Sequence, residues 1–362
     1  MHLAFSAALL ITLSTSAPTY TLRILPVPAG CNSYNFVGHG LSESGVVIGN
    51  LDCAEFSEFR AVLWDDEGMH LLPRLGGRNS YALGVSRDGS TVLGMADNGQ
   101  VAPDGQFVTR PVRWTDGTIV ELETLGGPFG AAVDVDPRGS IVGVCEDEEA
   151  DPQVERGPLR ACRWTDGVAS DLGGLGGPDA EALDVNKRGW IVGWASTTTP
   201  APTADGVPHV AFLHDGSRME NLGTLGGAWS EAYGINEAGE IVGYSETDVV
   251  TSPGFHEQHA FAWRRGVMRD LGSLAGGFAV AWDINDRGDV VGTCRVPVPG
   301  QRSPTVATLW RGSTIWNLND LVDELDGWEL RDATAIDNEG RILVLAFRAG
   351  ELRVAVLEPQ HP

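Results

Sequence analysis

Short apolar stretches of about five to seven residues, separated by polar turns, run along the chain after residue 18. They are rich in Val, Ile and aromatic residues and are bounded by Gly, which is typical of β-strands and too short for ordinary helices. One unit of four such stretches reads "EALDVN", "WIVGWAS", "HVAFLH" and "RMENLG" in chain order. The pattern predicts four short strands in each unit of about fifty residues.

This unit recurs seven times along the chain, with its first stretch anchored on a small residue in every copy. Four strands repeated at this period are typical of a β-propeller, whereas a β-solenoid, the main alternative together with a β-sandwich, usually has shorter repeats without paired tight hairpins. We therefore predict an all-β, seven-bladed β-propeller with four antiparallel strands per blade, forming a single domain over residues 18–360. The seven anchors are Gly38, Ala82, Ala132, Ala182, Ala232, Ala281 and Ala333.

Two tight turns in each unit predict the strand pairing. Turns such as "NKRG" at Asn186 join the first stretch to the second, and turns such as "WTDG" at Trp114 join the third to the fourth; in both, the final Gly suits a positive φ. The first stretch carries the smallest side chains, so we expect it to be the inner strand beside the axis. The extra stretch "YTLRILP" at Tyr20 is predicted to complete the last blade and close the ring.

The repeated motifs resemble the HAF repeats, a bacterial family described as probable extracellular repeat proteins. The His-Ala-Phe triplet stands intact at His259, Ala260 and Phe261, and the neighbouring pattern "NLGTLGGAWSEAYGINEAGEIVG" runs from Asn221 to Gly243. The resemblance covers nearly the whole chain after residue 18. It implies an exported β-rich protein and carries no assigned reaction or ligand.

The first seventeen residues, "MHLAFSAALLITLSTSA", contain an apolar run from Leu3 to Leu13 followed by small residues, as in a secretory signal. We interpret residues 1–17 as a signal peptide and the protein as extracellular or periplasmic. The run is too short to span a bilayer as a helix, so no transmembrane segment is expected. Two disulfides would suit an exported chain, and the predicted strand pairing favours Cys145 with Cys162 and Cys31 with Cys53.

The chain is strongly acidic, with a formal charge of −24 and a pI of about 4.6. Nucleic-acid binding needs clustered cations, so we expect no nucleic-acid partner. Lys187 is the only lysine and lies in a predicted turn, so lysine-based covalent chemistry has almost no candidate. The partner that remains is a protein or a glycan, bound by a monomer.

Asp134, Asp184 and Asp283 occupy the small position of the predicted inner strand, near the axis. They have two interpretations: carboxylates that converge on a calcium ion in the channel, or acceptors of backbone N–H groups that tie blades together. The second interpretation agrees better with Gly84 and Gly234 at the same position. No cofactor is expected, calcium being the one alternative.

Tryptophan and histidine recur at fixed places in the third stretch. One aromatic residue per blade is what packing between blades requires, although a carbohydrate platform is the alternative. His214 replaces the tryptophan in one unit, and His209 and His259 occupy equivalent positions, so we interpret all three as parts of the architecture, with metal ligation as the alternative for His209 and His259. The tryptophans are Trp64, Trp114, Trp164, Trp263 and Trp310.

The links between the second and third stretches vary most among the units, and variable loops on a rigid scaffold commonly carry function. We predict a binding surface on this face, with a solvated acidic loop as the alternative. Its candidate residues are Glu146, Asp147, Glu148, Glu149, Asp151, His256 and Glu257.

No catalytic triad, phosphate-binding loop or dinucleotide fingerprint stands out from the repeat. The sequence therefore favours a non-enzymatic, exported binding or interaction scaffold. A hydrolase or lyase that acts on a polysaccharide, with carboxylates from the same face, is the alternative.

Overall fold

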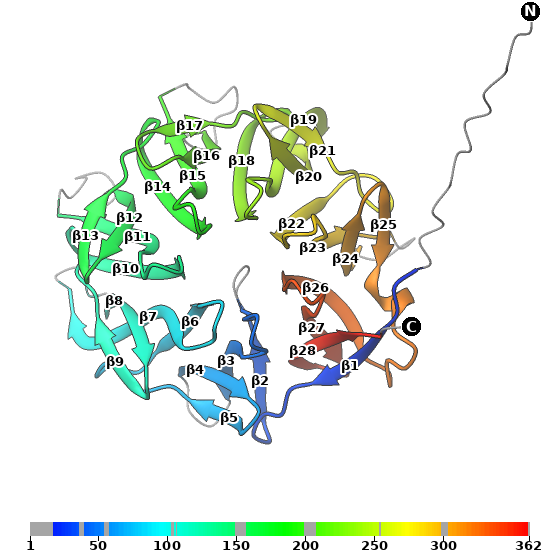
Figure 1. Cartoon of the computed structure of the whole chain (residues 1–362), viewed down its shortest axis with the longest axis horizontal. Coiled ribbons are helices and arrows are strands. Elements are labelled where there is room, and N and C mark those ends of the chain that lie inside the picture. The colour runs from blue at the N-terminus through cyan, green and yellow to red at the C-terminus, as the bar shows by residue number, and fades with distance from the viewer. Residues whose placement is uncertain are drawn as a thin grey trace, which may run out of the picture.

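The computed structural model of the chain describes residues 17–35, 40–53, 58–102, 105, 107–148, 157–198, 208–252, 255–297 and 303–360. Within these ranges the chain forms 28 strands and one short 3-10 helix, η1 (Leu318–Leu321). No helix among these residues is long and apolar enough to cross a membrane. The all-β prediction is confirmed, and the sheets stand around a central axis as in a β-propeller (Figure 1).

Five of the sheets have four strands each, and all their strand pairs are antiparallel. One sheet consists of β2 (Cys31–Tyr34), β3 (Val47–Cys53), β4 (Phe59–Asp65) and β5 (Gly68–Leu71). The second comprises β14 (Gly176–Val185), β15 (Ile191–Thr197), β16 (His209–His214) and β17 (Met219–Asn221). The third comprises β18 (Gly226–Ile235), β19 (Ile241–Ser252), β20 (Phe255–Arg264) and β21 (Val267–Asp270). The fourth is formed by β22 (Ala279–Ile284), β23 (Val290–Arg295), β24 (Thr305–Arg311) and β25 (Thr314–Asn317).

The remaining strands form one eight-stranded sheet and the sheet that joins the two ends of the chain. In the eight-stranded sheet, two antiparallel groups meet at a single parallel pair, Phe129 with Thr109. The first group is β6 (Ser80–Val85), β7 (Thr91–Val101), β8 (Phe107–Thr115) and β9 (Thr118–Glu121), and the second is β10 (Gly126–Val135), β11 (Ile141–Asp147), β12 (Leu159–Thr165) and β13 (Val168–Asp171). The last sheet is β26 (Glu329–Ile336), β27 (Ile342–Arg348), β28 (Glu351–Pro359) and β1 (Tyr20–Ile24).

The N-terminal strand closes the ring, as predicted. β1 pairs with β28 in antiparallel register, from Tyr20 opposite Pro359 to Ile24 opposite Ala355. The side chain of Tyr20 is 1% exposed and packs in the core between this sheet and the β22–β25 sheet. The closure therefore pairs an edge that an open array of sheets would leave exposed.

A β-bulge in the inner strands accompanies a repeated glycine on the second strand. In β14, Ala182 lies opposite Gly193 but Asp184 lies opposite Val192, so Leu183 is the extra residue. A Cβ atom on Gly193 would overlap the carbonyl oxygen of Glu181 on the paired strand. The glycine of the repeated "IVG" is therefore required where the two strands approach at the bulge.

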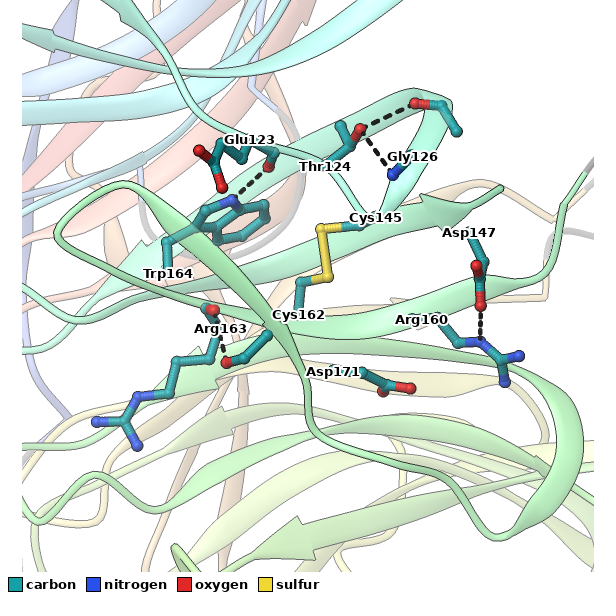
Figure 2. Close-up of a disulfide and its surroundings, with 12 residues drawn as sticks. Glu123, Thr124, Gly126, Cys145, Asp147, Arg160, Cys162, Arg163, Trp164 and Asp171 are labelled. Carbon is teal, nitrogen blue, oxygen red and sulfur yellow. Dashed lines mark hydrogen bonds and ion pairs between the residues drawn. A yellow bond between two sulfur atoms is a disulfide. The ribbon is translucent and has the colours of Figure 1, made fainter. Parts of the chain in front are cut away.

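The core lies between neighbouring sheets, where the repeated tryptophans pack. Trp164 is 1% exposed, and its indole Nε1 donates to the carbonyl oxygen of Glu123, in the segment that joins the two groups of the eight-stranded sheet (2.7 Å; Figure 2). Trp64, Trp114 and Trp310 form equivalent bonds to backbone oxygens. These contacts agree with packing between sheets and not with an open aromatic platform.

The strand order gives the ring two different faces. The links from the inner to the second strand and from the third to the outer strand lie on one side of the ring, which we call the turn face. We call the opposite side the loop face. The loop face holds the links from second to third strand and the "LGG" segments. In three sheets the inner strand already begins at the first glycine of that motif, namely Gly126, Gly176 and Gly226.

Candidate functional site

A small axial pocket of about 70 Å³ lies on the turn face, where the inner strands end. The three aspartates predicted to lie near the axis line this pocket. Each accepts a backbone N–H from the next sheet around the ring, so their carboxylates join sheet to sheet. The bonds run from Val185 to Asp134 (3.0 Å), from Ile235 to Asp184 (2.6 Å) and from Ile336 to Asp283 (2.7 Å).

Arg87 supplies a positive charge in the same pocket. Its guanidinium lies 2.9 Å from a carboxylate oxygen of Glu237 and 3.7 Å from one of Asp286. Burial alone would lower the pKa of Arg87, but the nearby carboxylates of Glu237 and Asp286 outweigh this effect and raise it. The acidic turn end of the channel therefore already contains a cation of the protein's own.

Asparagine side chains continue the links between sheets in the adjacent turns. The side-chain amides of Asn186, Asn236 and Asn285 donate to the backbone oxygens of Asn236, Asn285 and Asp337 respectively, over 3.1 to 3.2 Å. Buried amides bonded in this way hold neighbouring turns in a fixed arrangement. The turn face thus serves the closure of the ring.

The structure describes no group that resembles a metal site. Among the described residues, no three or more His, Cys, Asp or Glu side chains are arranged to hold a metal ion. Calcium also prefers six to eight oxygen ligands, and the aspartates of the axial pocket already accept backbone N–H groups.

The acidic segment at the end of β11 was predicted to be an exposed binding surface, and this is only partly so. Glu146 is buried, and its carboxylate accepts the backbone N–H of Gly157 at 2.7 Å, so it holds the base of the link instead of facing solvent. Asp147 pairs with Arg160 at 3.3 Å (Figure 2), and Glu148 is exposed. Glu149 and Asp151 lie outside the described residues.

Both predicted cysteine pairs are joined in the structure. Cys145 and Cys162 link β11 to β12 beside Trp164 (Figure 2), and Cys31 and Cys53 link β2 to β3. The fifth cysteine, Cys294, is buried and unpaired. Each bridge joins adjacent strands of one sheet, so it supports a sheet and not the contact between sheets.

His256 and Glu257 line an open groove on the loop face. The groove, with a volume of about 720 Å³, lies between the β19–β20 hairpin and the segment around Phe278 and Arg295. The Nδ1 atom of His256 lies 2.8 Å from the carbonyl oxygen of Thr247, and Glu257 pairs with His259 at 3.4 Å. These two side chains therefore support the hairpin while they border the groove.

A cluster of aromatic and carboxyl side chains, which sequence reasoning missed, lies on inner, second and third strands of neighbouring sheets, toward the loop face. At its centre the carboxylate of Glu231 accepts three hydrogen bonds from side chains. The donors are His209 Nε2 (2.7 Å), Tyr233 Oη (2.6 Å) and Tyr244 Oη (3.0 Å). His209, predicted to be architectural, is thus a member of this cluster.

Further rings and a second carboxyl group extend the cluster across three sheets. Glu181 accepts the indole N–H of Trp194 at 3.2 Å. The His209 ring lies between Trp194 and Trp229, with centroid distances of 4.9 and 4.3 Å, and Trp282 lies 4.6 Å from Tyr233. We call these eight residues the inner cluster: Glu181, Trp194, His209, Trp229, Glu231, Tyr233, Tyr244 and Trp282. Each of the eight residues is partly exposed to solvent.

The two carboxyl groups of the inner cluster have opposite pKa shifts. Burial, together with the negative charge of Glu231, raises the pKa of Glu181 to about 7. Burial acts in the same direction on Glu231, but the hydrogen bonds from His209 and Tyr233 outweigh it and lower the pKa of Glu231. Near neutral pH the cluster therefore pairs an ionised carboxylate with a partly protonated carboxyl group.

Residues of this cluster differ in type from the residues at the same positions in the other repeat copies, and this difference is visible in the sequence. Tyr233 and Trp282 are the bulge residues of β18 and β22, and bulges often redirect a side chain at a functional site. In sequence, the other five copies have His39, Leu83, Val133, Leu183 and Thr334 there. Glu181 and Glu231 likewise occupy a position that elsewhere holds Val37, Tyr81, Ala131, Val280 and Asp332.

Comparisons with known proteins agree on the fold. No family model and no curated protein matches the chain. The β-propeller domain of the trilobed protease from Pyrococcus furiosus, which has an open velcro topology, aligns with 91% of this chain and 98% of its own at a TM-score of 0.59 and 10% identity. An oligogalacturonate lyase from Vibrio parahaemolyticus aligns with 95% of this chain and 97% of its own at a TM-score of 0.58 and 10% identity. At such low identity these similarities establish the β-propeller fold alone.

Proposed function

We propose that this chain is an exported, seven-bladed β-propeller of the HAF-repeat type that acts as a non-enzymatic binding scaffold through its loop face. The count of seven takes the five four-stranded sheets together with the two halves of the eight-stranded sheet. Export is supported by the apolar N-terminal segment of the sequence and by the two disulfides. The ligand is a protein or a glycan.

The observation that carries this proposal is the pair of long hairpins on the loop face. β7–β8 and β19–β20 extend beyond the other strand pairs and lie on opposite sides of the axis (Figure 1). Their tips expose large apolar side chains: Val101, Phe107, Val249, Val250 and Phe255 are between 48% and 65% exposed. Each tip thus carries a group of exposed apolar side chains on an extended hairpin, and such groups can serve as an interaction surface.

A binding array of glycans and secreted proteins, followed by affinity measurement on each hit, tests the proposal. The double variant Phe107→Ser, Phe255→Ser should weaken binding of a true ligand by about tenfold or more. The matched control Val168→Ser, Val267→Ser removes two comparably exposed side chains from the turn face and should change affinity less than about twofold. Equal loss in both variants, or no loss in either, would contradict binding at the hairpin tips.

A polysaccharide-active hydrolase or lyase is the second candidate, and one observation favours it. Glu181 and Glu231 lie close enough to interact and have opposite pKa shifts, which is how general acids and bases are commonly arranged. Activity on a panel of polysaccharides, lost in both Glu181→Gln and Glu231→Gln, would support the enzyme. Activity that survives both substitutions would exclude these carboxyl groups as the catalytic pair.

A further inference from the structure

The inner cluster contains more negative than positive charge. The described donors to Glu181 and Glu231 are Trp194, His209 and two tyrosines, and only His209 acquires a positive charge, when it is protonated. Among the residues that the structure describes, no Lys or Arg forms an ion pair with either glutamate. This is unlike the turn face, where Arg87 fills the acidic pocket.

The charge imbalance affects Glu181 most strongly. Glu231 is held ionised by three hydrogen bonds, and its charge disfavours ionisation of Glu181 nearby. A partly buried pair of carboxyl groups with no Lys or Arg beside it is costly, because burial weakens hydration and strengthens repulsion. A cation placed beside the pair would remove this cost and allow both groups to ionise.

The aromatic rings are arranged so that their polar atoms are occupied. The hydroxyls of Tyr233 and Tyr244 donate to Glu231, and the indole nitrogens of Trp194 and Trp282 donate to Glu181 and Thr293. What these partly exposed rings can still offer a ligand is their electron-rich faces. Such faces attract ammonium groups, and several rings around a carboxylate are the usual means of recognising an alkylated amine.

We propose that the inner cluster is a binding site for an organic ammonium ion, carried by a small molecule or by an amine side chain of a partner. This site goes beyond the scaffold function and does not depend on it. A metal ion fits less well, because Glu231 already accepts three hydrogen bonds and the described residues contain no metal cluster. A neutral sugar could stack on the rings but would leave the charge imbalance in place.

Calorimetry with choline and its neutral isostere 3,3-dimethylbutan-1-ol tests the proposal on the whole chain. The two probes have the same shape and differ in the charge. Choline should bind at millimolar or lower concentration, and the isostere at least about tenfold more weakly. Equal binding of both probes, or no binding of choline at that concentration, would overturn the proposal.

Proton release gives a second readout that a neutral ligand would not produce. Because bound choline favours the ionised form of Glu181, binding at pH 7 should release up to about half a proton. The heat of binding should therefore differ between buffers of different ionisation enthalpy, and Glu181→Gln should abolish that difference. Proton release unchanged by Glu181→Gln would contradict the assigned site.

Variants locate the site and separate it from the loop face. Glu231→Gln should abolish choline binding, whereas Glu220→Gln, an exposed residue of β17 with the same change of charge, should not affect it. If Glu231→Gln fails to fold, Trp282→Leu should still weaken binding by about tenfold. The hairpin variant Phe107→Ser, Phe255→Ser should bind choline normally, so failure of the scaffold proposal would leave this result unchanged. Choline binding that survives both Glu231→Gln and Trp282→Leu would overturn the site.

Discussion

The two ends of the same inner strands use carboxyl groups in different ways. At the turn end of β14, Asp184 accepts a backbone N–H from the next sheet. Three residues earlier on the strand, toward the loop face, Glu181 bonds to the side chain of Trp194. Three copies have an aspartate at the turn end, and in each of them the bonded partner is a backbone N–H of the next sheet. At the loop end the bonded partner is a side chain, and side chains change from copy to copy. The turn end therefore serves the contact between sheets, and the loop end is where the copies differ in their partners.

The largest effect is expected where a neighbouring backbone comes closest at the turn end. Gly84→Ala would place a Cβ atom against the carbonyl oxygen of Val133, in the second group of the eight-stranded sheet, so we expect a loss of about 3 kcal/mol in the free energy of unfolding, measured by chemical denaturation. Gly234→Ala is the matched control, since the nearest atom to its added Cβ is 3.2 Å away. A similar loss in both variants would show that the approach of the sheets is not the cause.

Removal of a carboxylate at the turn end should have the next largest effect. Asp184→Ala leaves the buried N–H of Ile235 without this acceptor, and we expect unfolding to cost about 2 kcal/mol less. Glu220→Ala on exposed β17 should stay within about 0.5 kcal/mol of wild type in the same denaturation experiment. A stability for Asp184→Ala equal to that of the control would contradict the role given to the aspartates.

The loop end should respond to pH in the opposite sense to an ordinary carboxylate. The pKa of Glu181 is about 7 in the folded chain, above its ordinary value of 4.5, so the folded state binds more protons between these values. Stability should therefore fall as pH rises from about 4.5 to 7, by about 2 kcal/mol once partial solvent exposure is allowed for. Glu181→Gln should remove this fall and be more stable than wild type at pH 8 but not at pH 4. Parallel melting curves for wild type and variant across this pH range would contradict the assignment.

The smallest effect on stability is expected at the hairpin tips. Phe107 and Phe255 are 54% and 65% exposed, so replacing both by Ser should change the free energy of unfolding by less than about 0.5 kcal/mol. Thermal melting of the double variant beside wild type measures this. A marked loss of stability would mean that the tips pack against the protein and are not available for a ligand.

The fold was readable from the sequence because each unit repeats the residues that the bulge and the turns require. Gly193 and its equivalents, the turn asparagines and the core tryptophans all recur for reasons within one sheet or between adjacent sheets. Comparison of the copies marks Trp282 and Glu231 as unusual, but their meeting with His209 could not be predicted, because the three residues belong to three sheets and meet only through the bulges and the curvature of the ring. The buried position of Glu146 was missed for a related reason: a run of acidic letters does not show which side chain turns inward.

The titration of the Glu181 side chain tests the central claim most directly. Carbon-13 NMR of the chain with labelled glutamate, assigned by comparison with Glu181→Gln, reads this group alone. We predict a midpoint near pH 7 without ligand and a clearly lower midpoint when choline is added. A midpoint near the ordinary value of 4.5, or one that choline does not move, would contradict the claim that the loop end of the inner strands lacks a cation that a ligand supplies.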